Sequence, residues 1–198
     1  MHLWYRATLS RPRTFSRTDR PMHRIVHAHR ALEQHQRAIL FTLESYRPPR
    51  CPHCGVASLW GHGFYDRKAD RSAAGALNPV LVPRFRCTAC CRTCSRLPLC
   101  FCPRRWYGWA LQQLVLSLCM SGMSLRRIAA VVGVDRRTVG RWWRWLCGHG
   151  AGFAFALRSR FPELGRTDGD TAFWRACFAS MSLARAMAWL DSDGLDVP

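Results

Sequence analysis

The sequence predicts a mainly α-helical protein with a small β zinc ribbon and a tri-helical helix-turn-helix that follows it. Three observations predict this class. Two Cys-x-x-Cys pairs flank a stretch that is rich in glycine, proline and short β-type runs. Apolar residues then recur at helical spacing from about residue 104 to residue 146, as one buried face of a helix requires. The formal net charge is +18 over 198 residues, which indicates an acidic partner.

The first 47 residues divide into an arm and a helix. Residues 1–21 are basic and contain Pro12 and Pro21, which are poorly tolerated inside a helix, so we expect a loose arm. Its arginines either touch phosphates or are simply solvated. Between residues 22 and 47 the apolar residues recur at roughly helical spacing and predict one helix, which Pro48 and Pro49 end.

Four cysteines are predicted to bind one structural zinc ion within a ribbon that spans residues 48–103. They are Cys51, Cys54, Cys87 and Cys90. A two-residue gap lets two thiolates of one tight turn converge on an ion, and a second such turn completes tetrahedral coordination. Four protein ligands leave no position for water, so this zinc would stabilise the fold and not catalyse. The 32 residues between the pairs require a β-hairpin with a long loop near residues 66–79.

Other arrangements of the eleven cysteines stay open. Reduced structural cysteines or disulfides are the alternatives to zinc, and His53 or His62 could replace one thiolate. A second metal site could be built from a later group, namely Cys91, Cys94, Cys100 and Cys102. The remaining Cys119, Cys147 and Cys177 fit small buried hydrophobic residues best.

Residues 104–147 are predicted to form the helix-turn-helix unit. Ser124 caps one helix and Asp135 caps the next, since both residue types accept hydrogen bonds from free backbone amides. Gly133 provides the tight turn between the two helices. The apolar residues that would pack them together are Leu125, Ile128, Ala129, Val132, Val134, Val139 and Trp142.

The second helix of this unit carries the candidate DNA contacts. A recognition helix lies in the major groove and places its N-terminal residues at base edges. The residues predicted on or near its exposed side are Arg136, Arg137, Thr138, Arg141 and Arg144. Arg144 fits a phosphate contact better than a base contact. The alternative is a plain helical hairpin whose basic face is solvated.

The last segment, residues 148–198, differs from the rest of the chain. It has five arginines and six acids, so it is mildly acidic, and short helices are expected at about residues 171–190. The strong positive charge therefore belongs to the residues before it. Nucleic acid is the commonest partner of such a basic protein, and an anionic membrane surface is the alternative.

The predicted location is the bacterial cytoplasm, in association with the nucleoid. No apolar stretch of a secretory signal is visible near the N-terminus. The uncharged residues 106–125 reach the length of a membrane span, but their glutamines and serines favour a soluble helix. We expect neither a membrane partner nor a small-molecule substrate.

The two predicted modules together resemble the N-terminal DNA-binding region of bacterial insertion-sequence transposases. The resemblance covers roughly residues 50–147 and rests on a zinc ribbon that ends in a phrase of the type Arg-Cys-x-x-Cys-x-Arg-Thr before a helix-turn-helix. Here the phrase runs from Arg84 to Cys94, with Cys91 where glycine is usual and Cys94 where an aromatic residue is usual. Transposases cut DNA with carboxylates on a sizeable α/β domain, for which the 48 residues after Gly150 leave too little room.

We therefore expect zinc-dependent, sequence-specific binding of double-stranded DNA by a transposase-related protein that is not itself an enzyme. A homodimer is compatible with this function. Two alternatives stay open. One is a stand-alone transcriptional regulator that binds its own operator, and the other is a zinc-ribbon protein associated with RNA or the ribosome.

Overall fold

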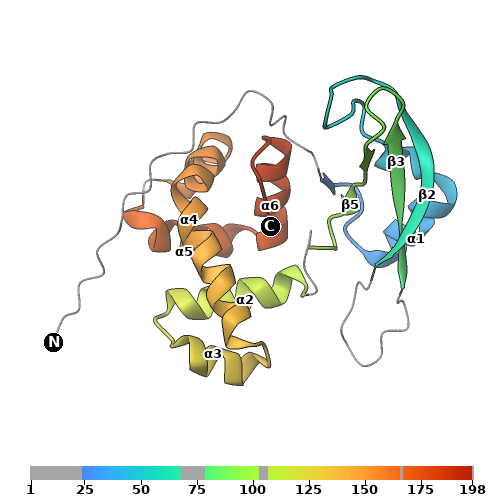
Figure 1. Ribbon diagram of the computed structural model, residues 1–198. Helices are drawn as coiled ribbons and strands as arrows, with labels where there is room; N and C mark the ends of the chain where they lie inside the picture. Colours follow the sequence, from blue (N-terminus) through green and yellow to red (C-terminus); the bar gives the residue numbers. More distant parts are fainter. Residues whose placement is uncertain (1–23, 68–78, 103–106, 166, 198) are drawn as a thin grey trace.

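The computed structural model describes residues 24–67, 79–102, 107–165 and 167–197. The chain is a mixed α/β protein in which helices predominate, since the described residues contain six α-helices and two small sheets. Figure 1 shows a β-rich part built from the first half of the chain beside a helical part built from the second half. We call residues 24–102 the N-terminal module and residues 107–197 the helical module. The coarse prediction of an α-rich chain with a small β unit is confirmed.

The N-terminal module begins with a short strand and not with a helix. Strand β1 (Ile25–Val26) precedes helix α1 (Leu32–Phe41) and the 3-10 turn η1 (Leu43–Tyr46). The single helix predicted over residues 22–47 is therefore too long, and residues 22 and 23 lie outside the described residues. Ile25 and Val26 are both buried, and a short apolar run of this kind fits a strand or a helix equally well by periodicity.

Three strands form an antiparallel sheet in this module. They are β2 (Leu59–Arg67), β3 (Val80–Cys87) and β4 (Thr93–Cys94). The hairpin predicted between the two cysteine pairs is thus present, whereas residues 68–78 of its predicted loop lie outside the described residues. The β2–β3 register shifts between Gly61 and Phe64, where Gly63 has a φ of +72°. Such a bulge increases the local twist of a sheet.

His35 of α1 is buried and joins three parts of the N-terminal module. Its Nδ1 lies 2.6 Å from the hydroxyl oxygen of Tyr46, and its Nε2 lies 2.9 Å from the carbonyl oxygen of Leu81. Because a carbonyl oxygen only accepts, Nε2 carries a proton, and in the neutral ring Nδ1 accepts from the tyrosine hydroxyl. Burial lowers the pKa of His35 from its ordinary 6.5 and thereby favours the neutral ring.

We expect the protein to lose stability as the pH falls below about 6.5. A histidine whose pKa is lower in the folded state binds fewer protons there, so protonation favours the unfolded chain, and the loss grows until the pH reaches the folded pKa. His35→Gln keeps a donor for Leu81 but does not titrate. Its free energy of unfolding in urea should therefore depend less on pH than that of the wild type between about pH 8 and pH 5.

The comparison isolates His35 because the other histidines are the same in both proteins. Burial also lowers the pKa values of His27 and His29, which contribute in the same direction. Equal pH dependence of the two proteins would contradict the assignment.

Strand β1 lies between the two modules. It pairs in parallel with β5 (Leu97–Pro98) of the N-terminal module. The side chain of Ile25 belongs to the apolar core of the helical module, whereas that of Val26 belongs to the core around the cysteines. Successive residues of a strand point to opposite sides, so a strand of two residues contributes to both cores.

A buried carboxylate attaches β1 to the last helix, α6 (Leu183–Ser192). Asp191 is 1% exposed and accepts hydrogen bonds from the backbone N–H groups of Arg24, at 3.0 Å, and Ile25, at 2.9 Å. A carboxylate is tolerated in a core only where such partners compensate its lost hydration. These bonds therefore connect the segment that leads into the N-terminal module to the end of the helical module.

Five helices build the helical module. They are α2 (Trp109–Met120), α3 (Leu125–Val132), α4 (Arg136–Arg160), α5 (Gly169–Ser180) and α6. A second 3-10 turn, η2 (Pro162–Leu164), joins α4 to the segment before α5. The helices predicted at about residues 171–190 are confirmed and are divided at Met181, after which Ser182 caps α6 by accepting from the backbone N–H of Arg185. Within the described residues, no helix has both the length and the apolar character that crossing a membrane requires.

Helix α4 runs on to Arg160 and so continues past residue 147, where the predicted helix-turn-helix unit ends. Gly150 is buried, and a Cβ atom at this position would lie 2.7 Å from Oδ2 of Asp170 in α5. The glycine therefore allows α5 to approach α4. Its low helix propensity, of about 1 kcal/mol relative to alanine, is outweighed by the packing of the two helices.

Candidate metal centre and nucleic-acid interface

Each Cys-x-x-Cys pair forms a tight turn of the same geometry. The backbone N–H of Gly55 donates to the carbonyl oxygen of Cys51 at 2.8 Å, and that of Cys91 donates to Cys87 at 3.0 Å. Gly55 and Cys91 both have left-handed backbones, with φ of +77° and +59°. Glycine adopts this conformation freely, but a residue with a Cβ does so rarely. The second turn thus has the same shape as the first, although Cys91 stands where the first turn has Gly55.

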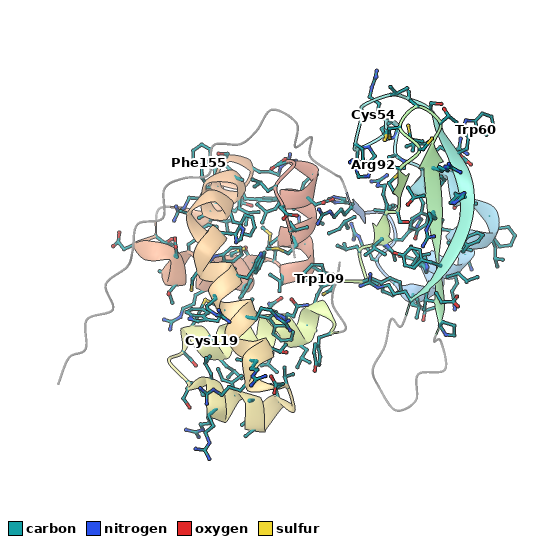
Figure 2. All side chains as sticks on the ribbon, in the orientation of Figure 1. Cys54, Trp60, Arg92, Trp109, Cys119 and Phe155 are labelled. Carbon is teal, nitrogen blue, oxygen red and sulfur yellow. The ribbon has the colours of Figure 1, made fainter. Side chains whose placement is uncertain are left out.

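The two turns bring four thiols together. The Sγ atoms of Cys51, Cys54, Cys87 and Cys90 all lie within 4.8 Å of one another, and Figure 2 shows sulfur atoms gathered at Cys54. Sγ of Cys51 is 3.7 Å from that of Cys90, and Sγ of Cys54 is 3.6 Å from that of Cys87. Zinc–sulfur bonds of about 2.3 Å in a tetrahedron put the sulfurs about 3.8 Å apart. Four cysteines therefore lie close enough to hold a metal ion, and their spacing fits zinc.

The surroundings of the thiols act in opposite directions: the pKa of Cys87 is lowered, whereas burial, followed by hydrogen bonds with the neighbouring thiols, raises the pKa values of Cys54 and Cys90. Cys51 and Cys87 are buried, whereas Cys54 and Cys90 are partly exposed. A hydrogen bond from the backbone N–H of Cys90 is the main cause that lowers the pKa of Cys87 to about 7. Hydrogen bonds of this kind stabilise a thiolate, which is the state of cysteine that coordinates metal. The group also forms part of the apolar core with Leu59.

The other cysteines do not form a second cluster among the described residues. There, the four cysteines are the one group of three or more metal-ligating side chains whose ligand atoms come close enough to share an ion. His53 and His62 do not belong to it. Cys94 is buried nearby, and burial, followed by the neighbouring thiols, raises its pKa to about 11. No disulfide joins cysteines within the described part of the chain.

Helices α3 and α4 meet at a turn whose predicted capping residues are confirmed. Oγ of Ser124 accepts from the backbone N–H of Arg127 at 3.3 Å, and Oδ1 of Asp135 accepts from that of Arg137 at 2.8 Å. Gly133 ends α3 in the left-handed conformation, with a φ of +67°. The turn is therefore held by local interactions at both sides.

The two helices are packed by the apolar residues that the sequence indicated. Ile128 and Val139 are fully buried, and Trp142 is 1% exposed. The structure adds Gly140, where a Cβ atom would lie 3.4 Å from Cδ1 of Leu125. Ala129, which was expected to help pack the two helices together, is only partly buried. Gly140 was missed because its role depends on the crossing of the helices and not on spacing along the chain.

The predicted DNA-contacting residues lie at the N-terminal end of α4. Arg136, Arg137, Arg141 and Arg144 are exposed, whereas Thr138 is half-buried and its hydroxyl accepts from Nη2 of Arg141 at 3.1 Å. Arg137, Arg141 and Arg144 follow one another at spacings of four and three residues, so they share one face of the helix. The structure thus brings together four arginines on a surface that faces away from the core.

Two further exposed arginines, missed in the sequence, lie on the neighbouring helix α3. Arg126 and Arg127 lie in the first turn of α3. The signal was present, because both lie within three residues of the capping Ser124. Asp135 is the only acidic residue between Asp70 and Glu163 in the sequence, and its carboxylate caps α4. The α3–α4 pair therefore carries a strong positive charge.

Comparison with known families adds one finding. Residues 51–142 match a family model described as "Domain of unknown function (DUF6431)". The match begins at the first clustered cysteine and ends within α4, so it includes both the cysteine group and the α3–α4 turn. Neither the curated proteins nor the solved structures contain a match to this chain.

Proposed function

We propose that this protein binds double-stranded DNA in a sequence-specific manner, with α3 and α4 acting as a helix-turn-helix and a zinc ribbon formed around the four cysteines. The observation that carries the proposal is the row of exposed Arg137, Arg141 and Arg144 on one face of α4. A capped turn and a buried apolar contact hold this helix against α3. The surface is positive, as a contact with DNA requires.

The arginines have different roles in the proposal. Arg137 and Arg141 lie in the first two turns of α4, where a recognition helix reaches base edges. A guanidinium fork there pairs with O6 and N7 of guanine. Arg126 and Arg127 at the start of α3, together with Arg144, would contact phosphates and set the position of the protein on the duplex.

Zinc has a structural role in this proposal. The ion would be held by Cys51, Cys54, Cys87 and Cys90. It would cross-link the turn that precedes β2 to the turn that follows β3. All four positions come from protein, so water has no place to be activated. The proposal therefore assigns no chemistry to the metal. Instead, the zinc ion would stabilise the N-terminal module, which is too small to depend on its apolar core alone.

Replacing Arg137 by alanine should weaken binding of the preferred duplex by about 1–3 kcal/mol, or about 5- to 150-fold. The preferred sequence is first selected from random duplexes, and affinity is then measured by fluorescence anisotropy at several salt concentrations. If Arg137 reads a guanine, the variant loses more affinity for the selected duplex than for a random one. Arg144→Ala should weaken binding of the selected and the random duplex equally. It should also reduce the slope of log affinity against log salt concentration by about one.

Arg37→Ala is the matched control, because Arg37 is an exposed arginine on α1 of the other module. It should leave duplex affinity unchanged. The proposal fails if Arg137→Ala and Arg141→Ala bind the selected duplex as tightly as the wild type does. A protein that binds RNA as tightly as duplex DNA, without regard to Arg137, would instead be the RNA-associated alternative.

We further propose a relation to the DNA-binding portion of transposases. Its support is the order of the two modules and the phrase from Arg84 to Cys94. Selection of sequences that resemble transposon ends would favour this context. Binding of a dimer to a palindromic operator would favour the transcriptional regulator.

A further inference from the structure

The sheet of the N-terminal module has one face that the DNA-binding proposal does not use. Trp60 of β2 lies directly opposite Arg86 of β3, and Arg86 lies opposite Thr93 of β4. Residues opposite each other in an antiparallel sheet share a face, and so do residues two apart in one strand. Arg84 is therefore on this face as well. We call Trp60, Arg84, Arg86 and Thr93 the Trp60–Arg86 face.

The two faces of the sheet differ strongly in burial at this end. Leu59, Phe85 and Cys87 point to the other side and are almost fully buried around the cysteines. Trp60 is 66% exposed, and Arg86 and Thr93 are exposed with it. Leaving a tryptophan in water forgoes the stabilisation that burial of an aromatic ring gives. A ring that its own fold does not cover is available to a ligand.

The charge of this region selects the class of ligand. Between Arg50 and Cys102 the sequence has two acids, Asp66 and Asp70. Asp66 lies opposite Leu81 at the far end of the hairpin, away from Trp60. Arg84 already lies against an aromatic ring, with its guanidinium carbon 5.2 Å from the centre of Tyr65. A ligand that is both negatively charged and rich in flat rings complements such a surface.

Single-stranded nucleic acid has both properties. Bases of a duplex are stacked on one another and hide their faces, whereas unpaired bases stack on exposed aromatic side chains while arginines contact the phosphates. A cross-strand row on a twisted sheet presents the ring and the cations side by side. We propose that the Trp60–Arg86 face binds single-stranded DNA, with a base on Trp60 and phosphates at Arg84 and Arg86.

This contact is separate from the duplex contact proposed for α4. Figure 2 shows Trp60 at the end of the N-terminal module that is remote from the helical module, whereas α3 lies at the opposite extremity of the molecule. A strand on the sheet and a duplex at the helices would therefore occupy different surfaces. The two proposals are independent, and either can fail without the other.

The test uses the full chain, loaded with zinc, and fluorescein-labelled oligothymidine of about 15 nucleotides, a length that covers one site of this kind. Trp60→Ala should weaken binding by about 5- to 150-fold, the equivalent of about 1–3 kcal/mol for one stacked base. Trp60→Phe, which keeps a flat ring, should restore most of the affinity. Arg86→Ala should weaken binding and reduce its salt dependence.

Two controls separate this face from the rest of the molecule. Phe64→Ala changes a ring that is 43% exposed on the other side of the β2 bulge and should have little effect. Arg137→Ala should leave oligothymidine binding unchanged, and Trp60→Ala should leave duplex affinity and zinc content unchanged. These readouts also show whether the variants are folded.

The proposal is overturned if Trp60→Ala, with normal zinc content, binds oligothymidine as tightly as the wild type. It is equally overturned if oligouridine binds at least tenfold more tightly with the same dependence on Trp60, since the ligand would then be RNA. A change in oligomeric state upon Trp60→Ala, without a change in oligothymidine affinity, would assign the face to another protein chain.

Discussion

Replacing Cys51 by serine is expected to abolish stoichiometric zinc binding and to unfold the N-terminal module. Cys51 is buried, and its Sγ lies 3.7 Å from that of Cys90 in the other turn. Serine is a poor ligand for zinc beside three thiolates, and no other described side chain reaches the group. Structural zinc in small modules contributes an apparent 10–16 kcal/mol, roughly, at neutral pH. No substitution outside the four clustered cysteines should have a comparable effect.

The measurement is metal content by mass spectrometry, together with the circular dichroism of the sheet. The wild type should hold about one zinc per chain, and Cys51→Ser and Cys87→Ser should hold none. Cys91→Ser is the closest control, because Cys91 is exposed and adjoins Cys90 of the four-cysteine group. Cys147→Ser is a second control in α4. A Cys51→Ser protein that retains zinc with full affinity would show that the ligand set is wrong.

Asp191→Ala is expected to lower the free energy of unfolding by about 3–5 kcal/mol, because it leaves buried backbone donors without their acceptor. The carboxylate accepts from the N–H groups of Arg24 and Ile25, and hydrogen bonds to a charged group contribute about 1.5–3 kcal/mol each. Asp191→Asn keeps one acceptor oxygen and should lose less. Denaturant unfolding measures the change, and hydrogen exchange at the amide of Ile25 locates it.

The matched control is Asp196→Ala. Asp196 forms an ion pair with Arg24 at 2.9 Å, but its side chain is 68% exposed, and such pairs contribute no more than about 1 kcal/mol. Asp196→Ala therefore removes a carboxylate from the same part of the chain, and this carboxylate also contacts Arg24. If Asp191→Ala is no less stable than Asp196→Ala, the buried contact does not hold β1 in place.

Local features of this protein could be predicted because the responsible residues are neighbours in the sequence. The two cysteine turns, the caps at Ser124 and Asp135, and the turn at Gly133 each depend on a few consecutive residues. The exposed arginines of α4 follow from helical spacing once those caps are placed. These are the parts in which local chemistry alone decides the geometry.

The features that were missed depend on residues far apart in the sequence. Gly150 does not end α4, because Asp170 of α5 packs against it. Strand β1 exists because Leu97 and Asp191 supply its partners. The pairing of Trp60 with Arg86 follows from a register that spans the long hairpin loop. Spacing along one segment contains no information about such partners.

The position of β1 also constrains the order in which this protein can assemble during synthesis. The N–H of Arg24 is separated from its acceptor by 167 positions in the chain, so the ribosome must complete most of the described polypeptide before that bond can form. Until then Ile25 lacks the core that receives its side chain, and the parallel β1–β5 pair lacks one of its supports. The cysteine turns can close much earlier, since 39 positions separate Cys51 from Cys90. Contacts of long sequence separation form slowly, so attachment of the earliest described strand belongs among the final steps of maturation.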